Sequence, residues 1–365
     1  METRYLIVGG GMTGDAAAKG IREHDAEGPI VLVGDERHEP YKRPPLTKGL
    51  WSGGDEAKIW RNTRDHGVDL RLGRRIVAVD LEARTAVDDA GEVYGWEKLL
   101  FATGGSPRRL AGDDANVVYF RTLDDYRTLR ERATDGTRVT VVGGGFVGSE
   151  IAAALVGVGA SVTMLFPEAT IGARLFPHDL GAFLNDYYRE KGVDVRPGES
   201  VADAAAIDAD VVVAGLGIVP NVELAEAAGL PVDNGIVVDE YGRVGGRDDV
   251  FAAGDVANFP SPVLGERFRV EHEDHANTHG KIVGGNMAGA HVVYDHIPFF
   301  YSDLFDLGYE AVGDVDSRLE VDAEWQEPFR KGVLTYLDGG RPRGVVLWNV
   351  WDKVDEARER LVQAR

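Results

Sequence analysis

The sequence predicts an α/β protein in which two doubly wound nucleotide-binding domains precede a C-terminal α+β domain. The main observation is a repeat, because the glycine-rich hexapeptide at residues 9–14 recurs at 143–148. Each copy follows a short apolar run and opens a segment with helical periodicity, after which a second apolar run follows. A strand, a glycine turn, a helix and a strand form the unit from which doubly wound nucleotide-binding sheets are built. A length of 365 residues leaves room for two or three such domains.

The elements can be placed in chain order from the apolar pattern. In the two repeats we expect strand, helix and strand in turn at 5–8, 15–22, 30–33, 139–142, 149–158 and 161–166. Three more short apolar runs end at glycine or aspartate, and they lie at 99–102, 211–214 and 250–253. Ligands of such folds bind where the parallel strands end, so functional residues are expected at these ends.

After about residue 297 the pattern changes. Apolar runs at 334–337 and 344–350 flank a turn at 338–341 that contains two glycines, which is typical of a β-hairpin. The last segment, 354–363, has a narrow apolar stripe on one helical face. Such a stripe suits a helix that packs on a sheet better than one that lies on a membrane.

Composition excludes several classes of function. The chain has 40 basic and 61 acidic residues, and its formal net charge of −21 disfavours nucleic acid and anionic membranes, which carry the same sign. The chain has no cysteine, so disulfides, thiolate nucleophiles, cysteine zinc sites and iron–sulfur ligation by its own residues are excluded. We predict no metal site.

We expect a cytoplasmic protein. No apolar stretch approaches the roughly 18 residues of a membrane span. The first residues run straight into an apolar segment, which leaves no room for a signal peptide. The acidic excess and the scarcity of lysine beside arginine fit a halophilic source, although a GC-rich genome would also favour arginine.

The glycines of each hexapeptide match what a dinucleotide pyrophosphate requires. The first permits a tight turn, the second lets the phosphates approach the backbone, and the third lets helix and strand pack closely. The phosphates then lie at the helix N-terminus, where N–H groups and the helix dipole favour an anion. The predicted phosphate-binding residues are Gly9, Gly11 and Gly14 in the first copy and Gly143, Gly145 and Gly148 in the second.

An acidic residue about 20 positions after the last glycine is expected to accept a hydrogen bond from a ribose hydroxyl. Asp35 lies 21 residues after Gly14, and Glu168 lies 20 residues after Gly148. A carboxylate at Glu168 also repels a 2′-phosphate, so the second site is predicted to prefer NADH to NADPH. Arg174 is the nearest residue that could contradict this preference, and we interpret it as a surface cation.

Further motifs carry a family resemblance. They are PYKRPPLTKGLW at 40–51, ATGG at 102–105, GGGFVGSE at 143–150, the segment 215–221 and AGDV at 253–256. Over essentially its whole length the chain resembles the FAD-dependent pyridine-nucleotide reductases, including ferredoxin and rubredoxin reductases. Within this group it is most similar to apoptosis-inducing-factor-type NADH oxidoreductases, on the motifs LFPE at 165–168, VEHEDHA at 270–276, YSDL at 301–304 and GYEAVG at 308–313.

The resemblance implies two Rossmann-like domains that bind FAD and NADH. The residues it implies for FAD, besides Lys48 and His272, are Gly9, Gly11, Gly14, Asp35, Arg43, Thr103, Gly104, Arg121, Gly254 and Asp255. Among them, Arg43 and Lys48 would face the flavin and Asp255 would bind its ribityl chain. The residues it implies for NADH are Gly143, Gly145, Gly148, Glu150, Glu168, Gly217 and Glu310.

The resemblance also implies catalytic residues. Lys48 would pair with Glu150 beside the contact between flavin and nicotinamide. Phe146 lies inside the glycine turn, where a large side chain has no core to fill, so it is expected to cover the flavin. His272 and Tyr301 are also expected near the flavin, with an ordinary helix-start histidine and simple core packing as the respective alternatives.

The implied reaction is transfer of hydride from NADH C4 to flavin N5. Because the chain has no cysteine relay, electrons must leave directly from the flavin, after a persistent charge-transfer complex of reduced flavin with NAD. The acceptor stays open between oxygen, quinone, ferredoxin and rubredoxin. One alternative is an NADH-dependent ferredoxin or rubredoxin reductase of an oxygenase system. The other is an NADH-sensing switch that forms a homodimer when the flavin is reduced.

The predicted domains follow a glutathione-reductase-like order. The FAD-binding domain takes residues 1–120 and 242–296, because the motif at Gly254 returns to it after an insertion. The inserted NADH-binding domain takes 121–241. The C-terminal α+β domain takes 297–365.

Overall fold

The computed structural model describes residues 1–112 and 116–363. Contacts between residues divide the chain into two compact units. The first unit consists of Met1–Lys42, Ala57–Ser106 and Pro220–Pro298, and the second of Arg43–Glu56, Pro107–Val219 and Phe299–Arg365. The three-domain division predicted from the sequence stays a prediction.

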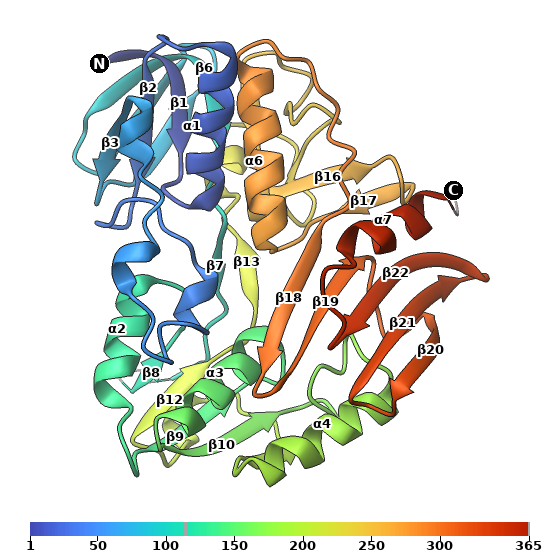
Figure 1. Cartoon of the computed structure of the whole chain (residues 1–365). Coiled ribbons are helices and arrows are strands. Elements are labelled where there is room, and N and C mark those ends of the chain that lie inside the picture. Colours follow the sequence, from blue (N-terminus) through green and yellow to red (C-terminus); the bar gives the residue numbers. More distant parts are fainter. Residues whose placement is uncertain (113–115, 364–365) are drawn as a thin grey trace. The chain divides into compact units, whose positions relative to one another are not determined.

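A seven-stranded sheet forms the centre of the first unit (Figure 1). Its strands are β1 Glu2–Val8, β2 Ile30–Gly34, β3 Val68–Leu72, β4 Ile76–Asp80, β5 Thr85–Asp88, β6 Val93–Phe101 and β15 Val250–Ala252. The order is β3-β2-β1-β6-β5-β4, and β15 also pairs with β6. Strands β3, β2, β1, β6 and β15 run parallel, which confirms the doubly wound sheet predicted for the first glycine repeat.

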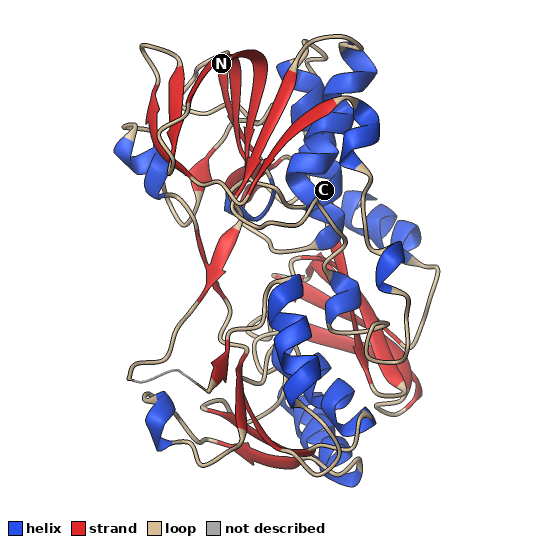
Figure 2. Ribbon diagram, turned by 90° about the vertical axis from the view of Figure 1, so that its left-hand side faces the viewer, coloured by secondary structure: helices blue, strands red, loops and turns tan. Residues whose placement is uncertain are grey.

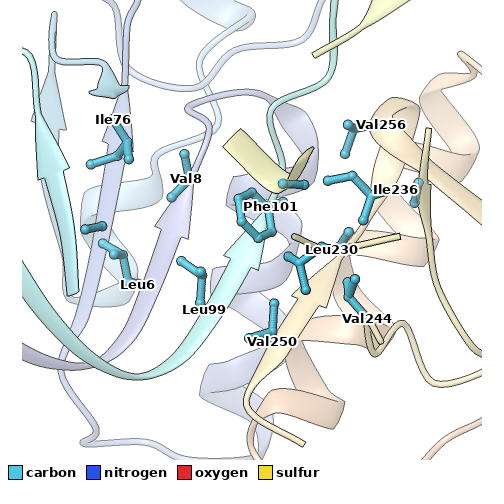
Figure 3. Packing of buried hydrophobic residues seen from close by; sticks show 14 of the residues in the cluster. Leu6, Val8, Ile76, Leu99, Phe101, Leu230, Ile236, Val244, Val250 and Val256 are labelled. Atoms are coloured by element: carbon cyan, nitrogen blue, oxygen red, sulfur yellow. The ribbon is translucent and has the colours of Figure 1, made fainter. Parts of the chain in front are cut away.

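Both faces of this sheet are covered. Successive residues of a strand point to opposite faces, so Leu6 and Val8 belong to one core and Tyr5 and Ile7 to the other. Figure 3 shows the first core, where side chains of β1 and β6 pack with Leu230, Ile236, Val244, Val250 and Val256. Where both faces are covered, consecutive strand residues are apolar, as in all five residues of β2 and in the last four of β1.

Helices α1 (Met12–His24) and α6 (Glu273–Met287) lie together on the other face of the sheet (Figures 1 and 2). Glycines let the two backbones touch. A β-carbon on Gly20 would lie 2.0 Å from the carbonyl oxygen of Lys281, and one on Gly284 would lie 2.1 Å from that of Ala17. This contact ties α6 directly to the helix that follows the first glycine turn.

The first unit also contains a small three-stranded sheet. It has the order β14-β16-β17, and its strands are β14 Ile236–Val237, β16 Ala257–Ser261 and β17 Glu266–Phe268. The short helices of this unit are α5 Glu223–Ala227, η3 Thr63–His66 and η5 Gly254–Val256. The paired strands β7 Gly105–Pro107 and β13 Ile218–Pro220 contain two of the points where the chain passes between units, and the helix η2 Glu56–Lys58 contains a third.

A five-stranded parallel sheet in the second unit repeats the strand–turn–helix–strand order. Its order is β11-β10-β9-β12-β8, with β8 Val117–Val118, β9 Arg138–Val142, β10 Ser161–Phe166, β11 Asp194–Pro197 and β12 Val211–Ala214. Helix α3 (Phe146–Gly157) connects β9 to β10, as the second glycine repeat predicts. Further helices of this unit are α2 Leu123–Arg132, α4 His178–Glu190, η1 Pro44–Leu46 and η4 Ala204–Ala206.

An antiparallel sheet closes the second unit, in the order β18-β19-β22-β21-β20. Its strands are β18 Phe299–Leu304, β19 Leu307–Gly313, β20 Glu320–Glu327, β21 Lys331–Asp338 and β22 Arg341–Trp348. Helix α7 (Val354–Gln363) packs on β19 and β22 through buried Ala357 and Leu361 (Figure 1). The predicted hairpin and closing helix are therefore confirmed. None of the helices in the described residues has the length and apolarity needed to cross a membrane.

A cluster of four buried rings lies in the first unit's core, and two of the rings belong to α6. His275 and His279 are fully buried with Phe259 and Tyr294. The Phe259 and His275 ring centroids lie 4.6 Å apart, those of His279 and Tyr294 lie 4.4 Å apart, and His275 Nδ1 lies 2.8 Å from the Tyr294 hydroxyl. Burial lowers the pKa of His279 to about 3 and holds the pKa of His275 well below its ordinary value. Both imidazoles are therefore neutral in the folded chain.

We expect these histidines to lower the free energy of unfolding as the pH falls from 7.5 to 5.5. The unfolded chain takes up a proton on each imidazole below pH about 6.5, while burial keeps the folded imidazole neutral. The loss is about 1.4 kcal/mol for each histidine at pH 5.5. Urea unfolding of the parent and of His275→Gln at both pH values measures this change in the free energy of unfolding. Between pH 7.5 and 5.5 the variant should lose about 1.4 kcal/mol less of it than the parent.

Repulsion among the acidic residues also weakens at low pH, so the informative quantity is the difference between the two proteins. An equal loss of stability in both would contradict the assignment of the pH dependence to His275.

Candidate functional site

The first glycine turn has the geometry of a phosphate cradle. It follows β1, and Gly9 adopts φ +128°, where a β-carbon would lie 2.1 Å from the carbonyl oxygen of Ala102. A β-carbon on Gly14 would lie 2.2 Å from the carbonyl oxygen of Gly9, so the helix starts in close contact with the turn. A β-carbon on Gly11 would meet no described atom within 4 Å. The middle glycine therefore faces open space, as a bound pyrophosphate needs.

The second glycine turn repeats this geometry. Gly143 adopts φ +120°, and its β-carbon would lie 2.3 Å from the carbonyl oxygen of Gly215. A β-carbon on Gly148 would lie 2.0 Å from the carbonyl oxygen of Gly143, while one on Gly145 would meet no described atom within 4 Å. The chain thus holds two cradles of the same construction.

The helices that leave these cradles offer their N-termini to an anion. Gly11 and Gly145 are the N-cap residues of α1 and α3, and no side chain of the described residues caps either helix. The first N–H groups of each helix and its dipole therefore favour a negative charge beside the second glycine. The residues of both turns fit dinucleotide pyrophosphates.

The predicted ribose-binding acids lie at the ends of β2 and β10 and are exposed or half-buried. Asp35 forms an ion pair of 3.1 Å with Arg75. Glu168 lies 3.8 Å from the guanidinium of Arg174, whose side chain is 90% exposed. Arg174 is a surface residue as interpreted from the sequence, and its guanidinium also lies near the Glu168 carboxylate, so it is the residue that could weaken the predicted preference for NADH.

Other predicted FAD residues of the first unit lie around the first cradle. A β-carbon on Gly254, which adopts φ +73°, would lie 2.1 Å from the hydroxyl of Thr13, so the turn leading to Asp255 packs on the first turn of α1. Thr103 donates a hydrogen bond of 2.7 Å to the carbonyl oxygen of Asn221, whose amide donates one of 2.8 Å to the Thr103 carbonyl. Asn221 was not predicted as a site residue, although it ends one of the motifs.

His272 is the N-cap residue of α6 and is half-buried. Burial lowers its pKa to about 4, so the imidazole is neutral near pH 7. A neutral ring can pack against a planar cofactor without the cost of desolvating a charge. Its role beside a flavin stays a prediction.

The carboxylate of Glu150 is a buried charge of the second unit that is held by several partners. It lies in the second turn of α3 with 7% exposure and forms an ion pair with Lys48, which follows the proline-rich helix η1. Thr47 Oγ1 donates to Glu150 Oε2 at 2.5 Å, and Ser302 Oγ donates to Glu150 Oε1 at 2.7 Å. Three donors offset the cost of burying this charge.

The structure therefore brings Lys48 and Glu150 together, although they are separated by 102 positions in the chain. The catalytic role of the pair stays a prediction. Sequence reasoning missed Thr47 and Ser302. Both lie beside predicted residues, within the motifs at 40–51 and 301–304, yet nothing in their spacing indicates that they bond the same carboxylate.

Aromatic rings lie close to this pair. Lys48 Nζ lies 5.1 Å from the ring centroid of half-buried Tyr301. Phe146, the first residue of α3, is 37% exposed and meets Phe300 edge to face at 4.9 Å between centroids. Strand β18 supplies Phe300 as a packing partner at the start of α3, a contact that the sequence did not indicate. The expected position of Phe146 over the flavin stays a prediction.

The remaining predicted residues of the second unit are more dispersed. Glu310, on β19, pairs in register with Tyr301 on β18. Its Oε2 is buried without a hydrogen-bond partner among the described residues, and burial raises its pKa. Arg43 donates a hydrogen bond of 2.7 Å to the backbone oxygen of Arg121. Gly217 adopts φ +78° in the turn after β12.

Comparisons with known proteins agree with this geometry. The family model described as pyridine nucleotide-disulphide oxidoreductase matches residues 3–280, and the model described as apoptosis-inducing factor, mitochondrion-associated, C-term matches 283–327. The chain is 38% identical over 331 residues to the ferredoxin–NAD(+) reductase component of the anthranilate 1,2-dioxygenase system of Burkholderia cepacia, covering 85% of this chain and 81% of the relative.

It is also 31% identical over 422 residues to mitochondrial apoptosis-inducing factor 1 of Dictyostelium discoideum, covering 100% of this chain and 79% of that protein. Among solved structures, putidaredoxin reductase in its covalent complex with putidaredoxin matches with a TM-score of 0.92 and 28% identity, covering 99% of this chain and 93% of that one. The chain therefore belongs to the pyridine nucleotide-disulphide oxidoreductase family, whose members are FAD-dependent NAD(P)H oxidoreductases.

Proposed function

We propose that the chain binds FAD at the first glycine cradle and NADH at the second, and that it reduces an external electron acceptor without a thiol relay. The observation that carries this proposal is the pair of matching cradles in a chain with no cysteine. FAD, when bound, supplies the hydride-accepting and electron-releasing chemistry. The protein's part is to align the two nucleotides and to exclude water.

The first candidate acceptor is a small iron–sulfur protein of the ferredoxin class. Its support is the similarity to a ferredoxin–NAD(+) reductase component and to putidaredoxin reductase. The net charge of −21 bears on docking, because an acidic partner would be repelled at low ionic strength. At an ionic strength of 0.1 M, salt largely screens this repulsion between charges more than about 10 Å apart.

The second candidate is slow electron release of the apoptosis-inducing-factor type, with a long-lived complex between the reduced protein and NAD and with dimerisation on reduction. Its support is the match of residues 283–327 to the C-terminal model of those factors. The rings of Phe146, His272 and Tyr301 are the residues proposed to stabilise such a complex.

A panel of acceptors distinguishes the two candidates. NADH oxidation by the purified holoprotein is measured with oxygen, a quinone, a ferredoxin and a rubredoxin, at low and high salt. We expect turnover with an iron–sulfur protein to exceed that with oxygen by about 100-fold or more and to rise with salt. Negligible turnover with every acceptor, together with a long-wavelength absorption band on anaerobic NADH titration and a dimer on sizing, would favour the second candidate instead.

Glu168 is expected to set the preference for NADH. We predict that Glu168→Gln lowers the ratio of kcat/KM for NADH over NADPH by about tenfold, because the variant no longer repels a 2′-phosphate and Arg174 can then pair with it. The matched control is Arg174→Gln, which should leave the ratio high or raise it. Steady-state kinetics with both nucleotides gives the ratios, and a parent enzyme that prefers NADPH would refute the assignment.

Glu150 is expected to control flavin reduction through Lys48. We predict that Glu150→Gln slows reduction by NADH about tenfold or more, because it removes the charge that fixes the Lys48 ammonium. Stopped-flow bleaching of the flavin measures the rate. The matched control is Arg127→Gln, which breaks the exposed ion pair with Glu56 in the same unit and should change neither the rate nor the melting temperature. Equal rates in Glu150→Gln and the parent would show that the pair has only a structural role.

A further inference from the structure

The ring cluster on α6 contains a polar contact that the proposed reaction does not use. The backbone N–H of Gly254 donates a hydrogen bond of 3.3 Å to Nδ1 of His279, and this contact is fully buried. Gly254 begins the helix η5 and directly precedes Asp255. The imidazole therefore holds the first peptide of the turn that presents Asp255.

The same turn is packed against the first phosphate cradle. A β-carbon on Gly254 would lie 2.1 Å from the Thr13 hydroxyl, and one on Gly280, the residue after His279, would lie 2.7 Å from the Thr13 carbonyl oxygen. Thr13 itself stands in the glycine turn between Gly11 and Gly14. The start of α1, the turn at Gly254 and helix α6 therefore meet at the N-terminus of α1. The side chain of His279 bonds α6 to the turn at Gly254.

The protonation of His279 follows from its surroundings. Burial lowers its pKa to about 3, so the ring is neutral near pH 7, with Nδ1 as the acceptor and the hydrogen on Nε2. Nε2 is buried and has no hydrogen-bond partner among the described residues. An apolar side chain of similar size would avoid this uncompensated donor. Within the described residues, the imidazole's hydrogen-bond partner is the peptide of Gly254.

We propose that His279 is a positioning residue of the FAD site, whose Nδ1 fixes the Gly254 peptide and thereby holds Asp255 beside the N-terminus of α1. The proposal rests on the proposed function, in which FAD occupies the first cradle. His279 does not touch the cofactor in this scheme, because it acts through the backbone of the turn. A hydrogen-bond acceptor at Nδ1 is the feature required, rather than an aromatic ring.

Two variants separate the acceptor from packing. In His279→Asn the side-chain oxygen can take the place of Nδ1, whereas His279→Leu keeps the volume without an acceptor. The full-length chain, freed of nucleotide, is titrated with FAD and followed by quenching of flavin fluorescence. We expect His279→Leu to raise the Kd for FAD about tenfold and His279→Asn to stay within about threefold of the parent.

The matched control is Tyr294→Phe. It alters the same buried cluster and removes the hydroxyl near His275, but it leaves the bond between Gly254 and His279 in place, so its Kd for FAD should equal that of the parent. Melting temperatures of all four nucleotide-free proteins report on packing alone. The proposal would be overturned if His279→Leu and His279→Asn weakened FAD binding equally, or if His279→Leu bound FAD as tightly as the parent. A parent chain that does not bind FAD would instead refute the proposed function.

Discussion

Close approach of backbone to backbone at the two glycine turns is the constraint on which both candidate nucleotide sites depend. In each turn the third glycine lies so near the first that a β-carbon would stand 2.2 Å or 2.0 Å from its carbonyl oxygen. This approach places the start of α1 or α3 at the end of its strand, with open space over the second glycine. An anion can then meet backbone N–H groups directly, without any charged side chain in the turn.

A buried and hydrogen-bonded polar side chain lies near each cradle, within the same unit. In the second unit, Glu150 lies near the start of α3 and is held by Lys48, Thr47 and Ser302. In the first unit, His279 bonds the Gly254 peptide, which packs on the start of α1. Buried polar groups are costly unless they are bonded, so they fix one arrangement of the chain where alignment matters.

Much of the fold could be predicted because its signals are local. The apolar runs, the two glycine hexapeptides and the hairpin turn at 338–341 each occupy a few consecutive residues, and each gave the correct element. The contacts of Phe146 with Phe300 and of Arg174 with Glu168 were not foreseen. These contacts depend on where a strand or a loop lies in the folded chain. The periodicity of the sequence does not indicate which partner a side chain on the surface of an element will contact.

The sequence by itself determined that the chain has two glycine-rich strand–turn–helix units, that it has no cysteine for a thiol relay and that its formal net charge is −21. These properties follow from residue types and from spacings within a single strand–turn–helix segment. Only the tertiary structure decided that Thr47 and Ser302 bond the same carboxylate as Lys48, and that His279 bonds the peptide before Asp255. A hydrogen bond needs its two atoms within about 3 Å, and residues 25 to 152 positions apart reach that distance only through the packing of whole elements.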